Sequence, residues 1–275
     1  MNALDATTQT KHRILTLGDT GSGKTTQILT LPGKKFVYCF DSNSLLSLRG
    51  HDVDYQEVLP DPVSAAASSL SKGKISDKRG TVSSDAYMRF EREFDLRLAE
   101  GFFDQYDWIC MDSTTTLLDL IMDRILSING RFGQWPNQDD YGPSMIAFTN
   151  ICRTLTGLGK GIYLTGHLET KQDQTTMKIS NRPMMTGRLV AKIPLLFSDI
   201  FYCDSELDDK GKVNYRIQTV PSGINRTIRT SIKGLEVFED VTIDFSKPVE
   251  GQGLGGILNW EAQQLSKNLP HSVSV

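Results

Sequence analysis

The sequence lacks the features of a membrane-spanning protein and of a zinc-binding site. Its four cysteines, at positions 39, 110, 152 and 203, include no C-x-x-C pair, so zinc and thiol redox sites are not predicted. No apolar run approaches the roughly 18–20 residues of a membrane span. The polar residues 1–11 also lack the apolar stretch of a signal peptide. We therefore expect buried, reduced thiols in a cytoplasmic protein with no membrane partner.

An excess of positive charge is also missing. The 30 Lys and Arg residues are outnumbered by 33 Asp and Glu residues, for a formal net charge of -3. No overall basic field therefore draws the chain onto nucleic acid, and any DNA contact requires a local patch or a patch repeated around an oligomer. The 275 residues, 39% of them hydrophobic, suffice for one large α/β domain. We find no internal repeat.

One glycine-rich stretch with the spacing G-x-x-x-x-G-K-[ST] carries the firmest prediction. It follows the apolar run of a strand over 12–17 and precedes a helix over 24–30, which Leu31-Pro32-Gly33 ends. This context is typical of a P-loop, in which backbone N–H groups hold phosphate oxygens. Lys24 should reach the β- and γ-phosphates, and the Thr25 hydroxyl should bind Mg²⁺. The predicted nucleotide-binding residues are Gly18, Asp19, Thr20, Gly21, Ser22, Gly23, Lys24, Thr25 and Thr26.

Further apolar runs predict core strands over 35–41, 53–59, 108–113 and 162–167. Runs that are apolar on both faces indicate a mostly parallel sheet with helices on both sides. Such sheets place their chemistry at the carboxyl ends of the strands.

Three polar residues end these predicted strands. Asp41 is a candidate catalytic residue, and Asp112 fits the Walker B pattern, in which the carboxylate binds Mg²⁺ together with Thr25. His167 is a candidate sensor of the γ-phosphate, and a loop histidine with only a structural hydrogen bond is the alternative.

Helical spacing predicts helices over 63–70, 84–100, 115–127, 141–158 and 257–265, and a candidate over 187–197 that Pro194 interrupts. The loop over 61–82 contains clustered basic residues and is either a solvated surface loop or a segment that touches DNA. The stretch over 168–185 is polar and has no clear periodicity.

Two strands, over 199–204 and 213–220, surround the turn Asp208-Asp209-Lys210-Gly211-Lys212, which predicts an antiparallel hairpin at one edge of the sheet. Arg226 and Arg229 follow it among β-branched residues. We expect a flexible arm (1–11), one domain (12–245) and a C-terminal tail (246–275) that docks on a neighbouring subunit or frays.

In this order the motifs resemble a RecA-like P-loop ATPase. More closely, they resemble small phage-encoded nucleotide-binding proteins that include single-strand annealing recombinases of the Sak type. The resemblance covers about residues 12–245. It is carried by the P-loop, the strand ending at Asp41 with the following residues 42–50, the Asp112 strand, the strand ending Thr165-Gly166-His167 and the hairpin before Arg226.

The resemblance implies a RecA-like fold, ATP with Mg²⁺, and homo-oligomers with ATP between subunits. It implies single-stranded DNA as a partner, a single-strand binding protein as a further candidate partner, and the host-cell cytoplasm if the chain is phage-encoded. In that family an arginine or lysine after the hairpin reaches the neighbour's γ-phosphate. Arg226 and Arg229 match it, with surface arginines on an edge strand as the alternative. Residues 169–185 correspond to a DNA-contacting loop of RecA relatives.

One departure from the family concerns catalysis. RecA relatives commonly carry a glutamate two residues past the acid that ends the second strand, and here that position is Asn43. Asparagine can orient a water molecule but cannot take its proton. Either Asp41 or Glu57 replaces the glutamate, or hydrolysis is slow, and we expect a weak ATPase.

Several functions remain open at this point. The leading interpretation is a RecA-like ATPase in DNA recombination or annealing. A replication or packaging motor of the same fold is the second. The third is a nucleotide-gated assembly factor without DNA contact, which the acidic composition and Asn43 favour. A small-molecule kinase would need a lid with clustered arginines, which we do not find.

Overall fold

The computed structural model describes residues 11–60, 76–77, 80–81 and 86–268. The predicted arm except for residue 11, the predicted helix over 63–70, and residues 269–275 of the predicted tail lie outside this range. So does most of the predicted loop over 61–82, apart from the short strands β4 (Ser76–Asp77) and β5 (Gly80–Thr81).

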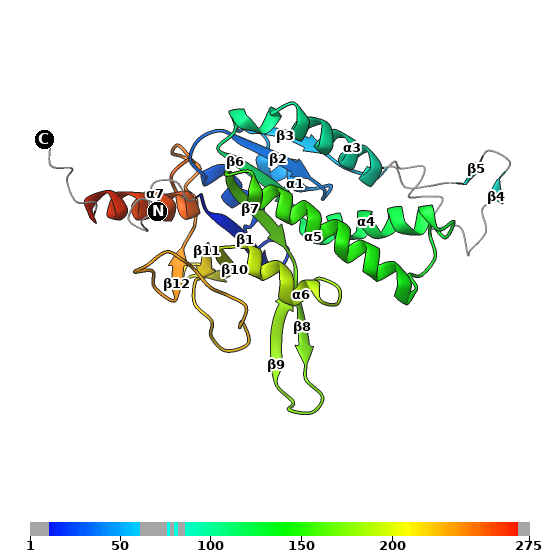
Figure 1. Ribbon diagram of the computed structural model, residues 1–275. Coiled ribbons are helices and arrows are strands. Elements are labelled where there is room, and N and C mark those ends of the chain that lie inside the picture. Colours follow the sequence, from blue (N-terminus) through cyan, green and yellow to red (C-terminus); the bar gives the residue numbers. More distant parts are fainter. Residues whose placement is uncertain (1–10, 61–75, 78–79, 82–85, 269–275) are drawn as a thin grey trace, which may run out of the picture.

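The main sheet has eight strands in the order β12-β11-β10-β1-β7-β6-β2-β3 (Figure 1). Its members are β1 (Arg13–Gly18), β2 (Lys35–Cys39), β3 (Asp54–Glu57), β6 (Trp108–Asp112), β7 (Gly161–Gly166), β10 (Asp199–Leu207), β11 (Val213–Gln218) and β12 (Phe238–Asp240). All pairs from β10 to β3 are parallel, whereas β11 and β12 extend the β10 edge in antiparallel fashion. The predicted mostly parallel sheet with an antiparallel hairpin at one edge is therefore confirmed.

The strands are apolar on both faces because each face is covered. In β2, the side chains of Phe36 and Tyr38 enter one hydrophobic cluster, and those of Val37 and Cys39 enter the other. This is the period of two expected of a strand buried on both sides. All four cysteines are buried and free, as predicted, and burial raises the pKa of the Cys203 thiol to about 12.

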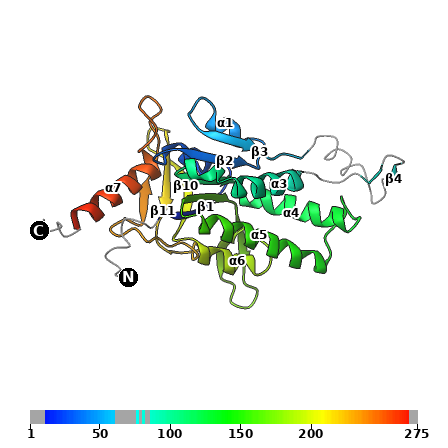
Figure 2. The same ribbon diagram turned by 45° about the horizontal axis from the view of Figure 1, so that its top comes forward.

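The helices divide between these two faces. Helices α3 (Ala86–Ala99), α4 (Thr114–Ile128), α5 (Tyr141–Gly157) and α6 (Leu189–Lys192) cover one face with the short turns η3 (Phe102–Gln105) and η5 (Ile193–Leu196). Helices α1 (Ser44–Leu48), η2 (Thr25–Thr30) and α7 (Gly253–Asn268) cover the other, and η4 (Gln138–Asp140) precedes α5. Figures 1 and 2 both show α7 far from α4 and α5. Among the described residues, no helix is both long and apolar enough to cross a membrane.

Two segments show how the structure differs from the sequence-based expectation. The helix predicted over 24–30 is the six-residue 3₁₀ helix η2, which ends at Thr30 because Leu31, the residue before Pro32, is extended. The aperiodic stretch over 168–185 forms a separate hairpin of β8 (Leu168–Gln172) and β9 (Ile179–Pro183), which projects from the body of the molecule (Figure 1). It lacks an alternating pattern because both faces are largely exposed to water.

Helix α7 packs on its own chain. Leu254 and Leu258 are buried in the same cluster as Ile28 of η2. The backbone N–H of Leu254 donates to Gln27 Oε1 at 2.9 Å, and that of Gly255 donates to Thr30 Oγ1 at 3.0 Å. The segment expected to be a tail from residue 246 therefore covers the helix that follows the glycine-rich loop. The division of the chain at residue 245 does not coincide with an end of the packed core.

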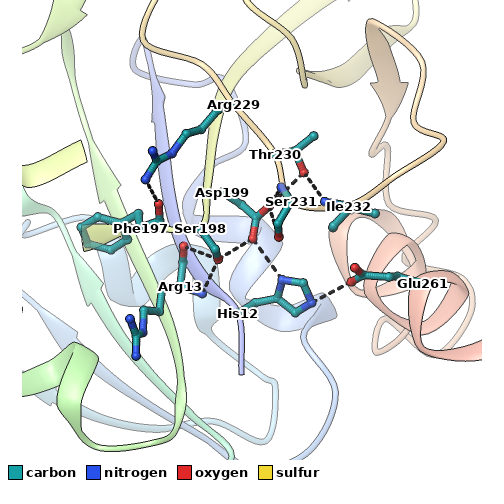
Figure 3. Close-up of polar contacts among 10 residues, drawn as sticks. All are labelled: His12, Arg13, Phe197, Ser198, Asp199, Arg229, Thr230, Ser231, Ile232 and Glu261. Atoms are coloured by element: carbon teal, nitrogen blue, oxygen red, sulfur yellow. Dashed lines mark hydrogen bonds and ion pairs between the residues drawn. The ribbon is translucent and has the colours of Figure 1, made fainter. Parts of the chain in front are cut away.

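A cluster of charged residues binds α7 to the end of the sheet that lies away from the glycine-rich loop. His12 Nδ1 lies 3.0 Å from Asp199 Oδ2, and its Nε2 lies 2.7 Å from Glu261 Oε2 (Figure 3). Burial alone would lower the pKa of His12, but the two carboxylates outweigh it and raise this pKa to about 9. Asp199 is fully buried and also accepts from Ser198 and Ser231, so its pKa falls to about 2 although burial acts in the opposite direction.

This cluster predicts a loss of stability at alkaline pH. The folded-state pKa of His12 exceeds its ordinary value of 6.5, so its contribution is complete below pH 6.5 and is lost as the pH rises through about 9. His12→Gln should reduce the free energy of unfolding by about 1–3 kcal/mol near pH 6 and by much less above pH 9. Urea unfolding across this pH range measures both. His51→Gln, at an exposed histidine, is the control that should keep the wild-type profile, and a wild-type profile in His12→Gln would contradict the prediction.

Candidate nucleotide-binding site

The glycine-rich loop joins the end of β1 to η2 and is closely packed from both sides. Gly23 has a φ of +84°, a conformation that side chains other than glycine rarely adopt. A Cβ at Gly23 would also meet the ring of Tyr215 at 2.9 Å, and one at Gly18 would meet the carbonyl oxygen of Cys203 at 2.5 Å. From the neighbouring strand β7, the Tyr163 hydroxyl donates to the Lys24 carbonyl at 2.7 Å. These contacts within the chain favour one curled form of the loop.

Lys24 lies across the mouth of this loop. Its Nζ donates to the carbonyl oxygens of Gly18 at 2.8 Å and Asp19 at 2.6 Å. Its side chain is buried, and burial lowers the pKa of the ammonium group, although nearby carboxylates of Asp112 and Asp19 oppose the effect. A buried cation with only neutral acceptors gains most from an anion, so this position suits a phosphate group.

Asp112 brings three hydroxyl groups together at the end of β6. Its Oδ2 accepts from Thr25 Oγ1 at 2.9 Å and from Ser44 Oγ at 2.5 Å, and its Oδ1 accepts from Thr165 Oγ1. A carboxylate beside a threonine hydroxyl is a set of hard oxygen donors, which Mg²⁺ prefers when phosphate oxygens and water complete its shell. Thr25 and Asp112 therefore fit the magnesium ion that the sequence motif implies. The described residues contain no group of three or more His, Cys, Asp or Glu side chains suited to holding a metal without such help.

The predicted strand-end residues converge on one cavity of about 400 Å³. Asp41, Asp112 and His167 line it together with Lys24 and Thr25. Asp41 Oδ1 accepts from Thr116 Oγ1 on α4, which fixes the carboxylate at the cavity wall. The loop residues Thr20, Gly21, Gly23 and Thr26 line the same cavity. The structure thus brings together residues from four separate strand ends, as parallel-sheet geometry requires.

The two predicted arginines lie outside this cavity. Arg229 pairs with Ile200 near the start of β10, at the end of the sheet away from the glycine-rich loop, and its guanidinium donates to the carbonyls of Pro194 and Phe197. Arg226 is exposed on the loop whose Asn225 bonds to Asn181 of β9. Neither arginine completes the cavity of its own chain, and their assignment to a neighbour's γ-phosphate stays a prediction.

Sequence reasoning missed several residues that hold or cover the predicted ones. Ser44 and Thr165 bond to Asp112, Thr116 bonds to Asp41, and Tyr215 covers Gly23. Thr165, at the end of an apolar strand run, had a weak signal in its position. Tyr215 had none, because only the pairing of β11 with β10 brings it to the loop.

Comparison with known proteins identifies the family. The AAA domain family matches residues 10–231. The chain belongs to this AAA-domain family. Together with the parallel sheet and the glycine-rich loop, this match shows that the AAA-domain protein has the RecA-like fold of nucleotide-binding P-loop ATPases. No curated protein matches the chain.

Two solved structures are similar to this AAA-domain chain. The flagellar accessory protein FlaH from Methanocaldococcus jannaschii is 12% identical with a TM-score of 0.43, over 87% of this chain and 91% of FlaH. A KaiC-like protein from Pyrococcus horikoshii OT3 is 10% identical with a TM-score of 0.41, over 85% of this chain and 86% of its own.

The position of Lys24 predicts the effect of its removal. Lys24→Ala should abolish detectable ATP binding in isothermal titration calorimetry and leave the fold intact in circular dichroism, because the missing ammonium group is the cation nearest the predicted phosphates. Lys210→Ala, in the exposed turn between β10 and β11, should bind ATP as the wild type does. Unchanged ATP affinity in Lys24→Ala would exclude the site.

Proposed function

We propose that this protein binds ATP with Mg²⁺, hydrolyses it slowly and acts on single-stranded DNA in recombination or annealing. The observation that carries the nucleotide part is the cavity in which Lys24 and the Thr25–Asp112 pair face one curled loop. The loop N–H groups and Lys24 would hold the triphosphate, and Thr25 and Asp112 would hold the metal ion. When bound, Mg²⁺ offsets the charge that develops on the phosphate oxygens.

The slow rate that we propose is supported by the groups available to activate water. Asn43 lines the cavity at the position of the usual glutamate, and an amide cannot accept a proton from water at neutral pH. Asp41 lines the cavity and is held by Thr116, whereas Glu57, at the end of β3, is not among the lining residues. Asp41 is therefore the better candidate base of the two. The Thr116 hydroxyl already occupies Oδ1 of Asp41, which leaves mainly the second oxygen to accept a proton from water.

A gain of activity tests this assignment. Asn43→Glu should raise the ATP turnover number by about tenfold or more, since a positioned general base contributes about 10²–10⁴-fold. Asn43→Gln, which has the same length without the carboxylate, should leave the rate low. Ser42→Glu, at an exposed neighbour that does not line the cavity, controls for added negative charge. A turnover number of Asn43→Glu equal to that of the wild type would exclude position 43 as the missing base.

A second copy of the chain is proposed to complete the cavity. Of the two arginines suggested by the family resemblance, Arg226 is exposed and has no carboxylate partner within the described residues, so it is available to a neighbour. Arg229 is bonded to its own chain's carbonyls and is a weaker candidate. A guanidinium group supplied by a neighbour would stabilise charge on the γ-phosphate and couple nucleotide binding to assembly.

The hairpin β8–β9 is the proposed DNA contact. It begins one residue after His167, which lines the nucleotide cavity. At the base of the hairpin, the N–H of Met184, the residue after β9, donates to the His167 carbonyl at 2.9 Å. Lys171 and Lys178 are exposed on it, while Arg182 is paired with Glu169. A change at His167 on nucleotide binding would therefore reach both ends of a projecting hairpin that carries two lysines.

Single-stranded DNA binding provides the test. A labelled oligonucleotide should bind with ATP and Mg²⁺, and its affinity should fall steeply with salt because lysines replace counterions on the phosphates. The double variant Lys171→Glu with Lys178→Glu should weaken binding. It should also reduce the logarithmic salt slope by about 0.7 for each phosphate group that a lysine no longer neutralises.

The hairpin between β10 and β11 offers a matched control. Lys210→Glu with Lys212→Glu makes the same charge change in an exposed turn and should bind DNA as the wild type does. Equally weakened binding in both double variants would indicate a general charge effect and exclude a hairpin-specific site. No DNA binding under any nucleotide condition would favour the nucleotide-gated assembly factor, and DNA-stimulated hydrolysis with strand unwinding would favour a motor.

A further inference from the structure

A second pocket of about 220 Å³ opens beside the nucleotide cavity. The two share Gly23, Thr26, Ser47 and Tyr215, so they adjoin along the start of η2. Beyond this junction the second pocket is walled by apolar and aromatic side chains that come after β12, namely Val241, Ile243 and Phe245. A molecule whose phosphates lie on the glycine-rich loop would extend into it.

From this geometry, and resting on the proposed nucleotide site, we infer that the second pocket binds the nucleobase by stacking and does not read the hydrogen-bonding edge of the base. Tyr215 packs directly over Gly23 and presents its half-buried ring at the junction. Phe245, on the far wall, is 60% exposed. Aromatic rings at both ends of an apolar pocket suit a flat heterocycle, and every base offers a face for stacking.

Several polar groups of the wall are already hydrogen-bonded within the protein. Gln27 Nε2 donates to the Val241 carbonyl at 2.9 Å, and Gln27 Oε1 accepts from Leu254 N–H. The Val241 N–H donates to the Tyr215 carbonyl at 2.8 Å, and the Tyr215 N–H donates to Thr242 Oγ1. These bonds occupy much of the Gln27 amide and the backbones of Val241 and Tyr215, so these groups offer few free donors or acceptors that could distinguish the amino group of adenine from the carbonyl of guanine.

The two hydroxyls at the junction have a different position. Thr26 and Ser47 line both pockets, and within the described residues their side chains have no hydrogen-bond partner in the protein. They stand between the phosphate end and the apolar end, where a ribose would lie, and their hydroxyls can exchange hydrogen bonds with its hydroxyls. The site would thus recognise triphosphate and sugar and accept either purine.

Calorimetric titrations with ATP, GTP and inorganic tripolyphosphate, each with Mg²⁺, test this inference. We expect ATP and GTP to bind the wild type within about fivefold of each other. Tyr215→Ala should weaken the binding of both by about tenfold, the effect of removing one stacked ring, and should lower tripolyphosphate affinity by much less. Tyr215→Phe keeps the ring and should bind all three as the wild type does. Phe245→Ala, at an exposed position that does not endanger folding, should weaken the binding of ATP and GTP and leave tripolyphosphate affinity unchanged.

The outcomes separate this inference from the proposed function. Wild-type ATP affinity in both Tyr215→Ala and Phe245→Ala would overturn the nucleobase pocket while leaving the phosphate site intact. A preference for one purine of more than about fiftyfold would overturn the absence of edge reading. Failure of the wild type to bind both ATP and tripolyphosphate would overturn the nucleotide site itself. Tyr55→Ala, at an exposed tyrosine on β3 at the other edge of the sheet, should change none of the three affinities.

Discussion

The carboxylate of Asp112 is the constraint on which the arrangement of the site depends. It lies almost fully buried at the end of a central strand, and its two oxygens accept hydrogen bonds from the hydroxyls of Thr25, Ser44 and Thr165. A buried carboxylate is costly unless it is well bonded, so these bonds fix η2, α1 and the end of β7 in relation to one another. The same oxygens are those that a bound metal ion would use, and the group that organises the fold is thus also the candidate ligand.

The two ends of the sheet differ in how their polar and charged groups are satisfied. At the carboxyl ends of the strands lie the glycine-rich loop, Asp41 and Asp112, with polar groups facing one cavity. At the other end, the His12 imidazolium joins the buried Asp199 to Glu261 of the C-terminal helix. The first end presents groups to a ligand, while the second satisfies its charges internally. This separation leaves the ligand end free to carry an unneutralised cation, Lys24, without weakening the core as a whole.

Local pattern was enough to predict the strands that build the parallel sheet and the long helices α3, α4 and α5, because these elements bury a regular apolar face. It also placed Asp41, Asp112 and His167 together at the carboxyl ends of the strands, since parallel strands end on the same side of a sheet. It failed for the β8–β9 hairpin, whose exposed faces leave no periodicity. It could not find Tyr215 or the Val241–Phe245 wall, because their nearness to the loop depends on pairing between distant segments. The short α1, which begins at Ser44, was missed for want of length.

Helix α7 has a consequence for where this protein can be shortened. The match to the AAA domain family ends at residue 231, and every motif lies before that point, yet Gln27 and Thr30 bond to the backbone of residues 254 and 255. A fragment that ends at the family boundary would expose Ile28 and remove both hydrogen-bond partners of the buried Gln27 amide, the Val241 carbonyl and the Leu254 N–H. It would also lose the burial of Leu254 and Leu258, about 1.5–3 kcal/mol for each side chain. The packed core is therefore larger than the region that the family match covers, and the last helix of the described residues covers the helix that follows the glycine-rich loop.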